Sequence, residues 1–163
     1  DDMYADLFNL GSIFNVEDRA KNLVNDYKAE LKSFKSNLET GEPIRAFVYD
    51  SGEDTPFTAG LYAMPTALIE AAGGVNVMNG FEKSWGTVTW EEVVAQNPEV
   101  IIIVNYGSVT AEQKRAFMMS NPAFSNIEAV KNDRFVTLEY VEATPGPRNI
   151  KAIKTLAKAF WGK

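Results

Sequence analysis

Residues 100–104 read Val100-Ile101-Ile102-Ile103-Val104, which is a run of five consecutive β-branched side chains. Such side chains fit the pleated surface of a strand, and an unbroken apolar run is typical of a strand that is covered on both faces. Strands of this kind occur in parallel sheets, because crossover helices cover both sides of the sheet. The run therefore predicts a central strand in a mainly parallel sheet.

Signals for further helices and strands flank this run. Thr89-Trp90-Glu91-Glu92 opens a helix through a capping box, and Asn97-Pro98 ends it. Thr110 and Gln113 open a second capped helix after the run. The remaining apolar patterns predict strands at 44–49, 75–78 and 135–140, and helices at 65–72 and 147–160. Because strands alternate with helices, we expect an α/β fold with a Rossmann-like, mainly parallel sheet flanked by helices.

A long amphipathic helix is expected before this α/β pattern. Apolar side chains from Val16 to Leu38 follow one another at steps of three or four and form one face. Asn15 and Asp18 stand where a capping residue and its partner would begin the helix, and Gly41-Glu42-Pro43 ends the pattern. A helix of roughly 24 residues would be about 36 Å long, so the sheet is preceded by a long connecting helix.

Composition excludes several classes of function. The net charge of −6 argues against nucleic acid as a partner and against binding to an anionic membrane surface. The chain contains no His and no Cys, so we expect no catalytic residue of those types, no disulfide, no transition-metal site built by the protein alone and no cofactor. No basic segment followed by an apolar one opens the sequence, so a signal segment is not expected within this chain.

Four loops are candidates for ligand binding. Ligands of open α/β sheets bind at the carboxyl ends of the strands, and the loops expected there are 50–55, 79–85, 105–108 and 141–148. Trp85, Tyr106, Tyr140 and Arg148 lie in or beside these loops. Aromatic faces supply contact area, and a guanidinium can bind carboxylate, phosphate or hydroxamate oxygens. We predict these four as ligand contacts. The alternatives are that Trp85 covers the core and that Arg148 forms a salt bridge or is a solvated residue in the first turn of a helix.

Catalysis by the same loops is less well supported. Ser51 follows a predicted strand, but the G-x-S-x-G pattern is absent and no His is present to act as its base. The carboxylates available near the loops are Glu53, Asp54, Glu139 and Glu142. Nothing in the sequence indicates that two of them converge, so we assign no catalytic residue. An α/β enzyme domain that uses loop carboxylates, and a receiver-like interaction module built around Asp50, stay as alternatives.

Five segments in order resemble the C-terminal lobe of class III substrate-binding proteins, the siderophore, haem and cobalamin binders of ABC importers. The segments are VYDSGEDTPFTAG at 48–60, AAGGVNV at 71–77, WGTVTWEEV at 85–93 followed by NPEVI at 97–101, AVKNDRF at 129–135, and PGPRN at 145–149. Together they cover most of 44–160. Their combination is specific for the family but not for its ligand.

The resemblance implies that two α/β lobes are joined by one rigid helix, with the ligand between the lobes. On this basis residues 1–14 are the remnant of an N-terminal lobe, 15–40 are the interlobe helix, and 41–163 are the C-terminal lobe. The apolar pattern in the first range predicts a helix over 3–14 with a break near Gly11. The N-terminal lobe of the same protein would then be missing from this chain.

The resemblance also implies a function. It predicts the extracytoplasmic substrate-binding component of an ABC importer, either periplasmic or lipid-anchored at the cell surface. The expected ligand is a small-molecule metal chelate of the siderophore, haem or cobalamin class, and a ferric siderophore or related iron chelate is favoured. The expected macromolecular partners are ABC permease subunits.

Glu91 is the candidate residue for docking to a permease. If Thr89 is the N-cap, Glu92 stands at N3 and can accept a hydrogen bond from the Thr89 N–H, which leaves Glu91 without a structural task. The positive end of the helix dipole favours a carboxylate at this place. In the family that the chain resembles, a glutamate on each lobe pairs with permease arginines, and Glu91 is the matching position. A solvated acid in the first helical turn is the alternative.

Overall fold

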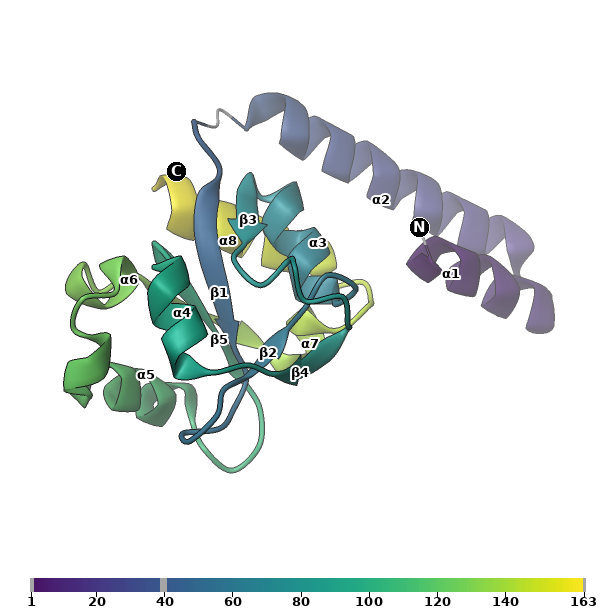
Figure 1. Cartoon of the computed structure of the whole chain (residues 1–163). Helices are drawn as coiled ribbons and strands as arrows, with labels where there is room; N and C mark the ends of the chain where they lie inside the picture. Colours follow the sequence, from purple (N-terminus) through teal and green to yellow (C-terminus); the bar gives the residue numbers. More distant parts are fainter. Residues whose placement is uncertain (1, 39–40, 163) are drawn as a thin grey trace.

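Strand β5 (Val100–Asn105) lies in the middle of a parallel sheet in the computed structural model, which describes residues 2–38 and 41–162 (Figure 1). It pairs in parallel with β1 on one side and with β6 on the other. The sheet has the strand order β3 (Gly74–Asn76), β1 (Ile44–Tyr49), β5 and β6 (Phe135–Glu139). The expected fold class and the central position of the 100–104 run are confirmed.

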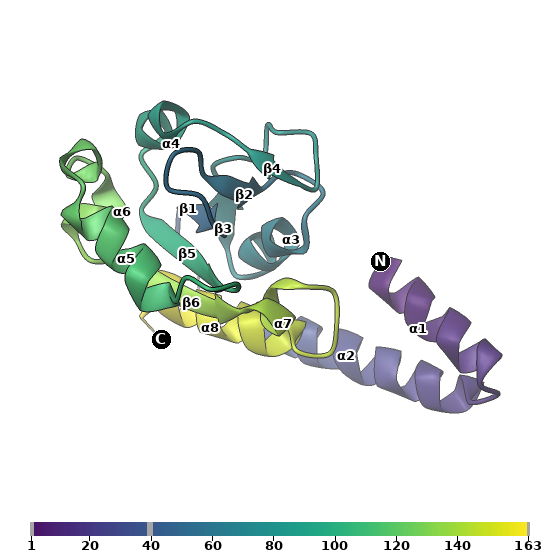
Figure 2. The same ribbon diagram turned by 90° about the horizontal axis from the view of Figure 1, so that it is seen from below.

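Both faces of β5 are covered by helices (Figure 2). Its residues 100–104 are each at most 1% exposed. Ile102 packs in one core cluster with residues of α3 and α8, whereas Ile101 and Ile103 pack in a second cluster with residues of α4, α5 and α6. The helices concerned are α3 (Met64–Ala71), α8 (Asn149–Trp161), α4 (Trp90–Gln96), α5 (Ala111–Ser120) and α6 (Glu128–Lys131). Alternate side chains of one strand therefore hold two helical layers together.

The capping signals also form as predicted. The Glu92 backbone N–H donates to Thr89 Oγ1 over 3.2 Å, and the Thr89 N–H donates to Glu92 Oε2 over 2.7 Å. Thr110 and Gln113 make the same reciprocal pair at the start of α5, with distances of 2.8 and 3.3 Å. In this way, two backbone N–H groups at each helix start that have no partner within the helix receive a hydrogen-bond acceptor. Residues within three positions of one another therefore determine where these helices begin.

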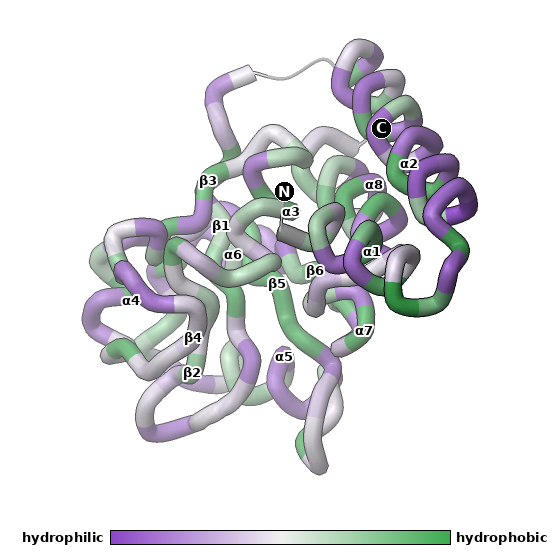
Figure 3. The backbone as a smooth tube through the Cα atoms, turned by 90° about the vertical axis from the view of Figure 1, so that its right-hand side faces the viewer, coloured by the Kyte–Doolittle hydropathy of each residue, from purple (hydrophilic) through white to green (hydrophobic). Residues whose placement is uncertain are grey.

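The long connecting helix is confirmed as α2 (Glu17–Asn37), which is unbroken through Tyr27. It forms an antiparallel hairpin with α1 (Asp2–Ile13) and lies against α8, to which it is linked by an ion pair between Glu30 and Lys154 at 2.7 Å (Figure 1). Figure 3 shows strongly hydrophobic residues at the turn of this hairpin, beside the mostly hydrophilic α2. Within the described ranges, no helix combines the length and the apolar character needed to cross a bilayer.

The expected break near Gly11 is wrong, because α1 continues to Ile13. Gly11 is buried where the two helices of the hairpin meet, and a Cβ placed on it would lie 2.6 Å from the Cβ of Ala20. The glycine thus permits close contact between the helices rather than ending one of them. The expected cap at Asn15 is also wrong. Asn15 adopts a left-handed conformation with φ of 51° in the turn, and Val16 occupies the N-cap position without a side-chain hydrogen bond.

Several boundaries differ from the sequence-based expectation. The long helix ends at Asn37, before the Gly41-Glu42-Pro43 signal, and residues 39–40 of the range assigned to it lie outside the described residues. The last strand ends at Glu139, because Glu139 and Glu142 form a capping box that starts the short helix α7 (Tyr140–Ala143). The last helix begins at Asn149 rather than at Pro147. A two-stranded antiparallel sheet, β2 (Phe57–Ala59) with β4 (Trp85–Thr87), was not predicted.

Truncation of the central strand should destabilise the whole lobe. We expect Ile102→Ala to lower the free energy of unfolding by about 2–5 kcal/mol, because the surrounding layers cannot collapse fully into the cavity. Met119→Ala, on an α5 side chain that is 42% exposed, is the control and should change it by about 0.5 kcal/mol or less. Urea denaturation of the three proteins measures the difference, and equal stability of both variants would contradict the central role of β5.

Candidate ligand-binding site

A cavity of about 290 Å³ opens at the carboxyl ends of the parallel strands. Its wall includes Trp85 from the start of β4, Tyr106 from the loop after β5 and Tyr140 from the start of α7. Three of the four predicted ligand contacts therefore come together, although they are separated by up to 55 positions in the sequence. The other described lining residues are Asp50, Phe57, Val104, Ala143 and Thr144.

The aromatic side chains of this cavity form two stacked pairs. The rings of Tyr106 and Tyr140 have centroids 4.7 Å apart and planes inclined by 27°. The rings of Phe57 and Trp85 have centroids 6.0 Å apart and are inclined by 11°. Tyr106 and Tyr140 are 54% and 48% exposed, so they offer aromatic surface to a ligand. Trp85 is half-buried and also packs against the core, so covering the core and lining the cavity are roles that it combines.

Phe57 is a lining residue that the sequence reasoning missed. It lies two residues after the candidate loop 50–55 and within the first segment of the family resemblance. Its strand has only three residues, which is too short for an alternating pattern to be recognised. The antiparallel pairing of β2 with β4 brings Phe57 next to Trp85, and this pairing depends on contacts between distant parts of the chain.

Arg148 and Glu91 do not line this cavity. Arg148 is exposed at the N-cap position of α8, and its charge acts on Glu142. Glu91 is exposed in the first turn of α4, whereas its neighbour Glu92 is engaged with Thr89 in the capping box. The geometry thus separates the predicted residues into three that share one cavity and two that are exposed elsewhere on the surface.

The loop carboxylates near the cavity have structural partners. Glu139 accepts hydrogen bonds from the Asn105 side-chain amide at 3.1 Å, and Glu142 accepts one from the Glu139 N–H at 3.1 Å. Buried Glu142 also pairs with Lys151 at 2.6 Å. Burial acts to raise the pKa of Glu142, but the hydrogen bonds from Lys151 and Glu139 and the charges of Lys151 and Arg148 hold that pKa below its ordinary value. A carboxylate with a lowered pKa is a poor general acid at neutral pH.

Asp50 is the charged side chain on the wall of the cavity. It is 8% exposed at the end of β1, and its Oδ2 accepts a hydrogen bond from Ser51 Oγ over 3.0 Å. In the part of the chain that the structure describes, no group of three or more acidic side chains could hold a metal ion. The cavity therefore offers mainly aromatic contact, with a single carboxylate on its wall.

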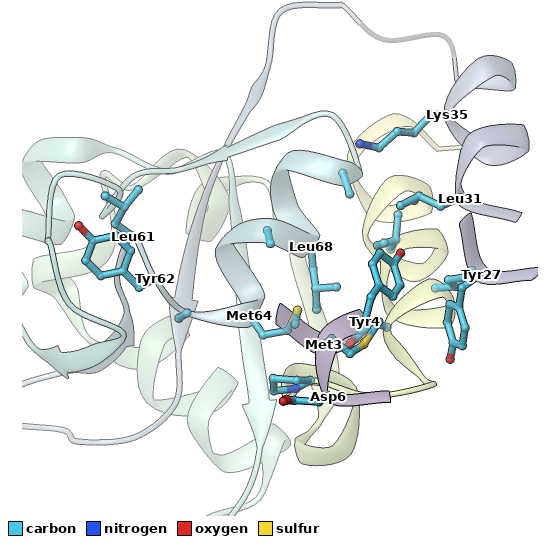
Figure 4. A pocket seen from close by; sticks show the side chains of 17 residues that line it. Met3, Tyr4, Asp6, Tyr27, Leu31, Lys35, Leu61, Tyr62, Met64 and Leu68 are labelled. Carbon is cyan, nitrogen blue, oxygen red and sulfur yellow. The ribbon is translucent and has the colours of Figure 1, made fainter. Parts of the chain in front are cut away.

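A larger hollow of about 450 Å³ lies between α1, α2, α3 and α8 (Figure 4). Its mostly apolar wall includes Tyr4, Tyr27, Leu31, Met64 and Leu68. Among the described residues that line it, none is a predicted ligand contact. Because ligands of open α/β sheets bind at the carboxyl ends of the strands, we place the candidate site in the smaller cavity.

The sequence and the fold match known binding proteins. A family model described as "Periplasmic binding protein" matches residues 1–141. The crystal structure of a periplasmic binding protein from Veillonella parvula DSM 2008 is 35% identical, with a TM-score of 0.89 over 99% of this chain and 56% of that chain.

Two curated relatives match at lower identity. The vitamin B12-binding protein of Vibrio cholerae serotype O1 is 24% identical over 131 residues, which are 79% of this chain and 45% of that protein. The ABC transporter substrate-binding lipoprotein YvrC of Bacillus subtilis (strain 168) is 24% identical over 164 residues, which are 98% of this chain and 50% of that protein. The chain spans about half the length of the curated relatives it matches.

The ionised form of Glu142 should stabilise the segment that carries Tyr140. Because the pKa of Glu142 is lower in the folded state than in the unfolded chain, its contribution is present above about pH 4.5 and is lost as the pH falls through the folded-state pKa. We expect Glu142→Gln to be less stable than the wild type at pH 7, with a difference that narrows below about pH 4.5. Urea denaturation at a series of pH values measures this difference.

The matched control is Glu70→Gln, at an exposed carboxylate on α3. This variant should follow the wild-type pH dependence closely. A stability difference for Glu142→Gln that stays constant from pH 7 to about pH 3 would contradict the stabilising ion pair with Lys151.

Proposed function

The chain belongs to the periplasmic binding protein family, and on this basis we propose that it is the C-terminal half of the substrate-binding component of an ABC importer. The observation that carries the proposal is the convergence of Trp85, Tyr106 and Tyr140 on one cavity at the carboxyl ends of the strands. The relatives and the structure named above are binding proteins, which supports binding rather than catalysis or a receiver-like role.

The chain is an extracytoplasmic protein. Its family is periplasmic by description, and the relative from Bacillus subtilis is a lipoprotein. These relatives are compatible with two locations for the protein: in a periplasm, or at a cell surface to which a lipid attaches it.

The proposed ligand is a metal chelate, and within that class a ferric siderophore or a related iron chelate. The metal would reach the site already chelated, so the protein would contact the organic chelator. Two stacked aromatic pairs suit the flat or apolar surfaces of such a molecule. The cavity volume of about 290 Å³ is at the lower limit for a complete small-molecule site. This volume is consistent with a site of which this lobe forms one half and a second lobe the other. Haem and cobalamin are the competing chelates in the same test.

The second lobe would belong to the same protein. In this proposal α1 derives from the N-terminal lobe, α2 is the interlobe helix, and the α/β part that follows is the C-terminal lobe, in keeping with the divisions expected at 1–14, 15–40 and 41–163. At the turn of the α1–α2 hairpin, Ile13, Phe14 and Val16 are 70%, 68% and 42% exposed. Exposed apolar side chains that gather in one place are typical of a contact surface, which supports a neighbouring lobe at this end of the hairpin.

Replacement of the cavity aromatics should weaken chelate binding by the full-length protein. We expect Tyr106→Ala and Tyr140→Ala each to weaken binding by about 1–2 kcal/mol, because stacking area is lost. Trp85→Phe should reduce the ligand-induced tryptophan quenching, because Trp85 lines the cavity, whereas Trp90 and Trp161 do not. Arg148→Ala should weaken an anionic chelate by about 1.5–3 kcal/mol.

Calorimetric titration with a ferric siderophore, haem and cobalamin measures these affinities and identifies the chelate class. The control is Tyr62→Ala, at a tyrosine that is 67% exposed and outside this cavity, and it should bind as the wild type does. Unchanged affinity in Tyr106→Ala and Tyr140→Ala would remove the cavity from the proposed site, and unchanged affinity in Arg148→Ala would remove that residue.

We further propose that Glu91 docks the lobe onto a permease subunit. Its carboxylate is exposed and has no task in the capping box, so it is available to a cationic partner. A surface charge of this kind changes association and its salt dependence more than it changes the fold. We expect Glu91→Arg in the full-length protein to impair uptake and permease binding, with ligand affinity and melting temperature nearly unchanged.

The control for docking is Glu70→Arg, which reverses the charge of another exposed carboxylate. It should support transport at the wild-type rate. Normal uptake by Glu91→Arg, or a loss of uptake that is explained by unfolding, would contradict the docking role.

A further inference from the structure

Lys114 is an almost fully buried cation beneath the candidate ligand-binding site. It lies in the second turn of α5 and is only 2% exposed. Burying an ammonium group costs several kcal/mol unless the group is paired with charges or hydrogen-bond acceptors. The partners of Lys114 therefore indicate what this buried charge does in the fold.

Two backbone carbonyls accept hydrogen bonds from the Lys114 ammonium. Nζ donates to the carbonyl of Val104 over 2.7 Å and to the carbonyl of Tyr106 over 3.1 Å. These carbonyls lie on either side of Asn105, the residue at which β5 ends. Hydrogen bonds to a charged donor are about twice as strong as neutral ones, so one side chain restrains the direction in which the chain leaves the strand.

The restrained segment carries an exposed aromatic side chain. Tyr106 is 54% exposed, and the next residue, Gly107, has a φ of 82°, so the chain turns sharply here. The ring of Tyr106 is nonetheless stacked on Tyr140 with a centroid distance of 4.7 Å. An exposed side chain on a turn has few packing contacts that could hold it in place. The position of the Tyr106 ring therefore depends on how the Tyr106 backbone is held.

The charge at a second strand end also acts on this ammonium. Burial lowers the pKa of Lys114, and the negative charge of Asp50, at the end of β1, acts in the opposite direction. Asp50 is 8% exposed and lines the same cavity as Tyr106. Lys114 itself lines a smaller cavity of about 190 Å³ between the loop residues 51–53 and 106–109. The ammonium thus lies between the two loops that leave the central strands.

We propose that Lys114 is a positioning residue for ligand binding, because its ammonium holds the Tyr106 backbone so that the Tyr106 ring stacks on Tyr140 and forms one wall of the cavity. A binding surface that is ordered before the ligand arrives avoids the entropic cost of ordering it on binding. The role in binding rests on the proposed function, whereas the anchoring of the loop can be tested without a ligand.

The first test measures hydrogen–deuterium exchange in the ligand-free, full-length protein. Lys114→Met removes the charge and both hydrogen bonds but keeps an unbranched side chain of similar length. We expect amides of residues 105–110 to exchange about tenfold faster, with no change in β1 and β6. Lys131→Met, at an exposed lysine on α6, is the control and should leave this loop unchanged. Unchanged exchange of 105–110 in Lys114→Met would overturn the proposal, whether or not the protein binds a chelate.

The second test is a double-mutant cycle with Tyr106→Ala, using a ferric siderophore, haem and cobalamin as probes. If Lys114 acts through Tyr106, Lys114→Met should weaken chelate binding about tenfold in the wild-type background and by less than about twofold in Tyr106→Ala. Equal weakening in both backgrounds would overturn the proposal. If the wild type binds none of the probes, the proposed function fails, and the exchange experiment alone decides the anchoring role.

A chemical variant covers the case in which Lys114→Met does not fold. The 163 residues contain no Cys, so Lys114→Cys introduces the one thiol among them, and any cysteine elsewhere in the full-length protein is replaced by Ser. Alkylation of the unfolded protein with 2-bromoethylamine forms an S–C bond with loss of bromide and restores an ammonium at the original chain length. Alkylation with 1-bromopropane gives a neutral side chain of the same length.

After refolding, the ammonium form should recover the slow exchange of 105–110 and the wild-type affinity, and the neutral form should recover neither. If the two forms behave alike, the charge does not position Tyr106 and the proposal is overturned.

Discussion

The burial of β5 on both faces is the constraint on which the rest of this lobe depends. A strand with no exposed face must find apolar partners above and below, and Ile102 on one side and Ile101 and Ile103 on the other meet two separate helical layers. Its backbone N–H and C=O groups must also be paired, because water does not reach them. Parallel strands on both sides meet that requirement, and the crossover helices of parallel connections supply the two layers.

The same constraint creates the candidate binding site. Parallel strands end on one edge of the sheet, so the loops after β1, β5 and β6 come together there. These loops leave a closely packed core, and their side chains are free to contact a ligand. The stacked pair of Tyr106 and Tyr140 joins the ends of β5 and β6 above the core. Lys114 holds the end of β5 through two backbone carbonyls and lies within the electrostatic reach of Asp50 at the end of β1, so the loop after β5 begins from a restrained backbone.

The α1–α2 hairpin has a different origin. Its helices meet at Gly11 and Ala20, and α2 then packs on α8, so the hairpin extends from the lobe as an arm (Figures 1 and 2). The arm leaves apolar side chains exposed at its turn, in contrast to the closed core around β5. The lobe has a closed core of its own, whereas the arm exposes apolar side chains that a neighbouring surface could cover. This combination fits one half of a two-lobed binding protein.

The sequence by itself determined the central strand, the α/β class, the two capped helix starts and the continuity of α2. Each of these depends on neighbours within four positions or on a periodic apolar pattern, and such signals are complete within one segment. The rule that ligands bind at the carboxyl ends of parallel strands also selected the loops that carry or adjoin Trp85, Tyr106 and Tyr140. Only the tertiary structure decided that these three share a cavity, that Phe57 joins them and that Arg148 does not line it. It likewise decided that Gly11 is a helix contact, and that Lys114, which no sequence pattern singled out, is buried next to the site. These outcomes depend on strand order and on which surfaces meet, and residues far apart in the chain determine both.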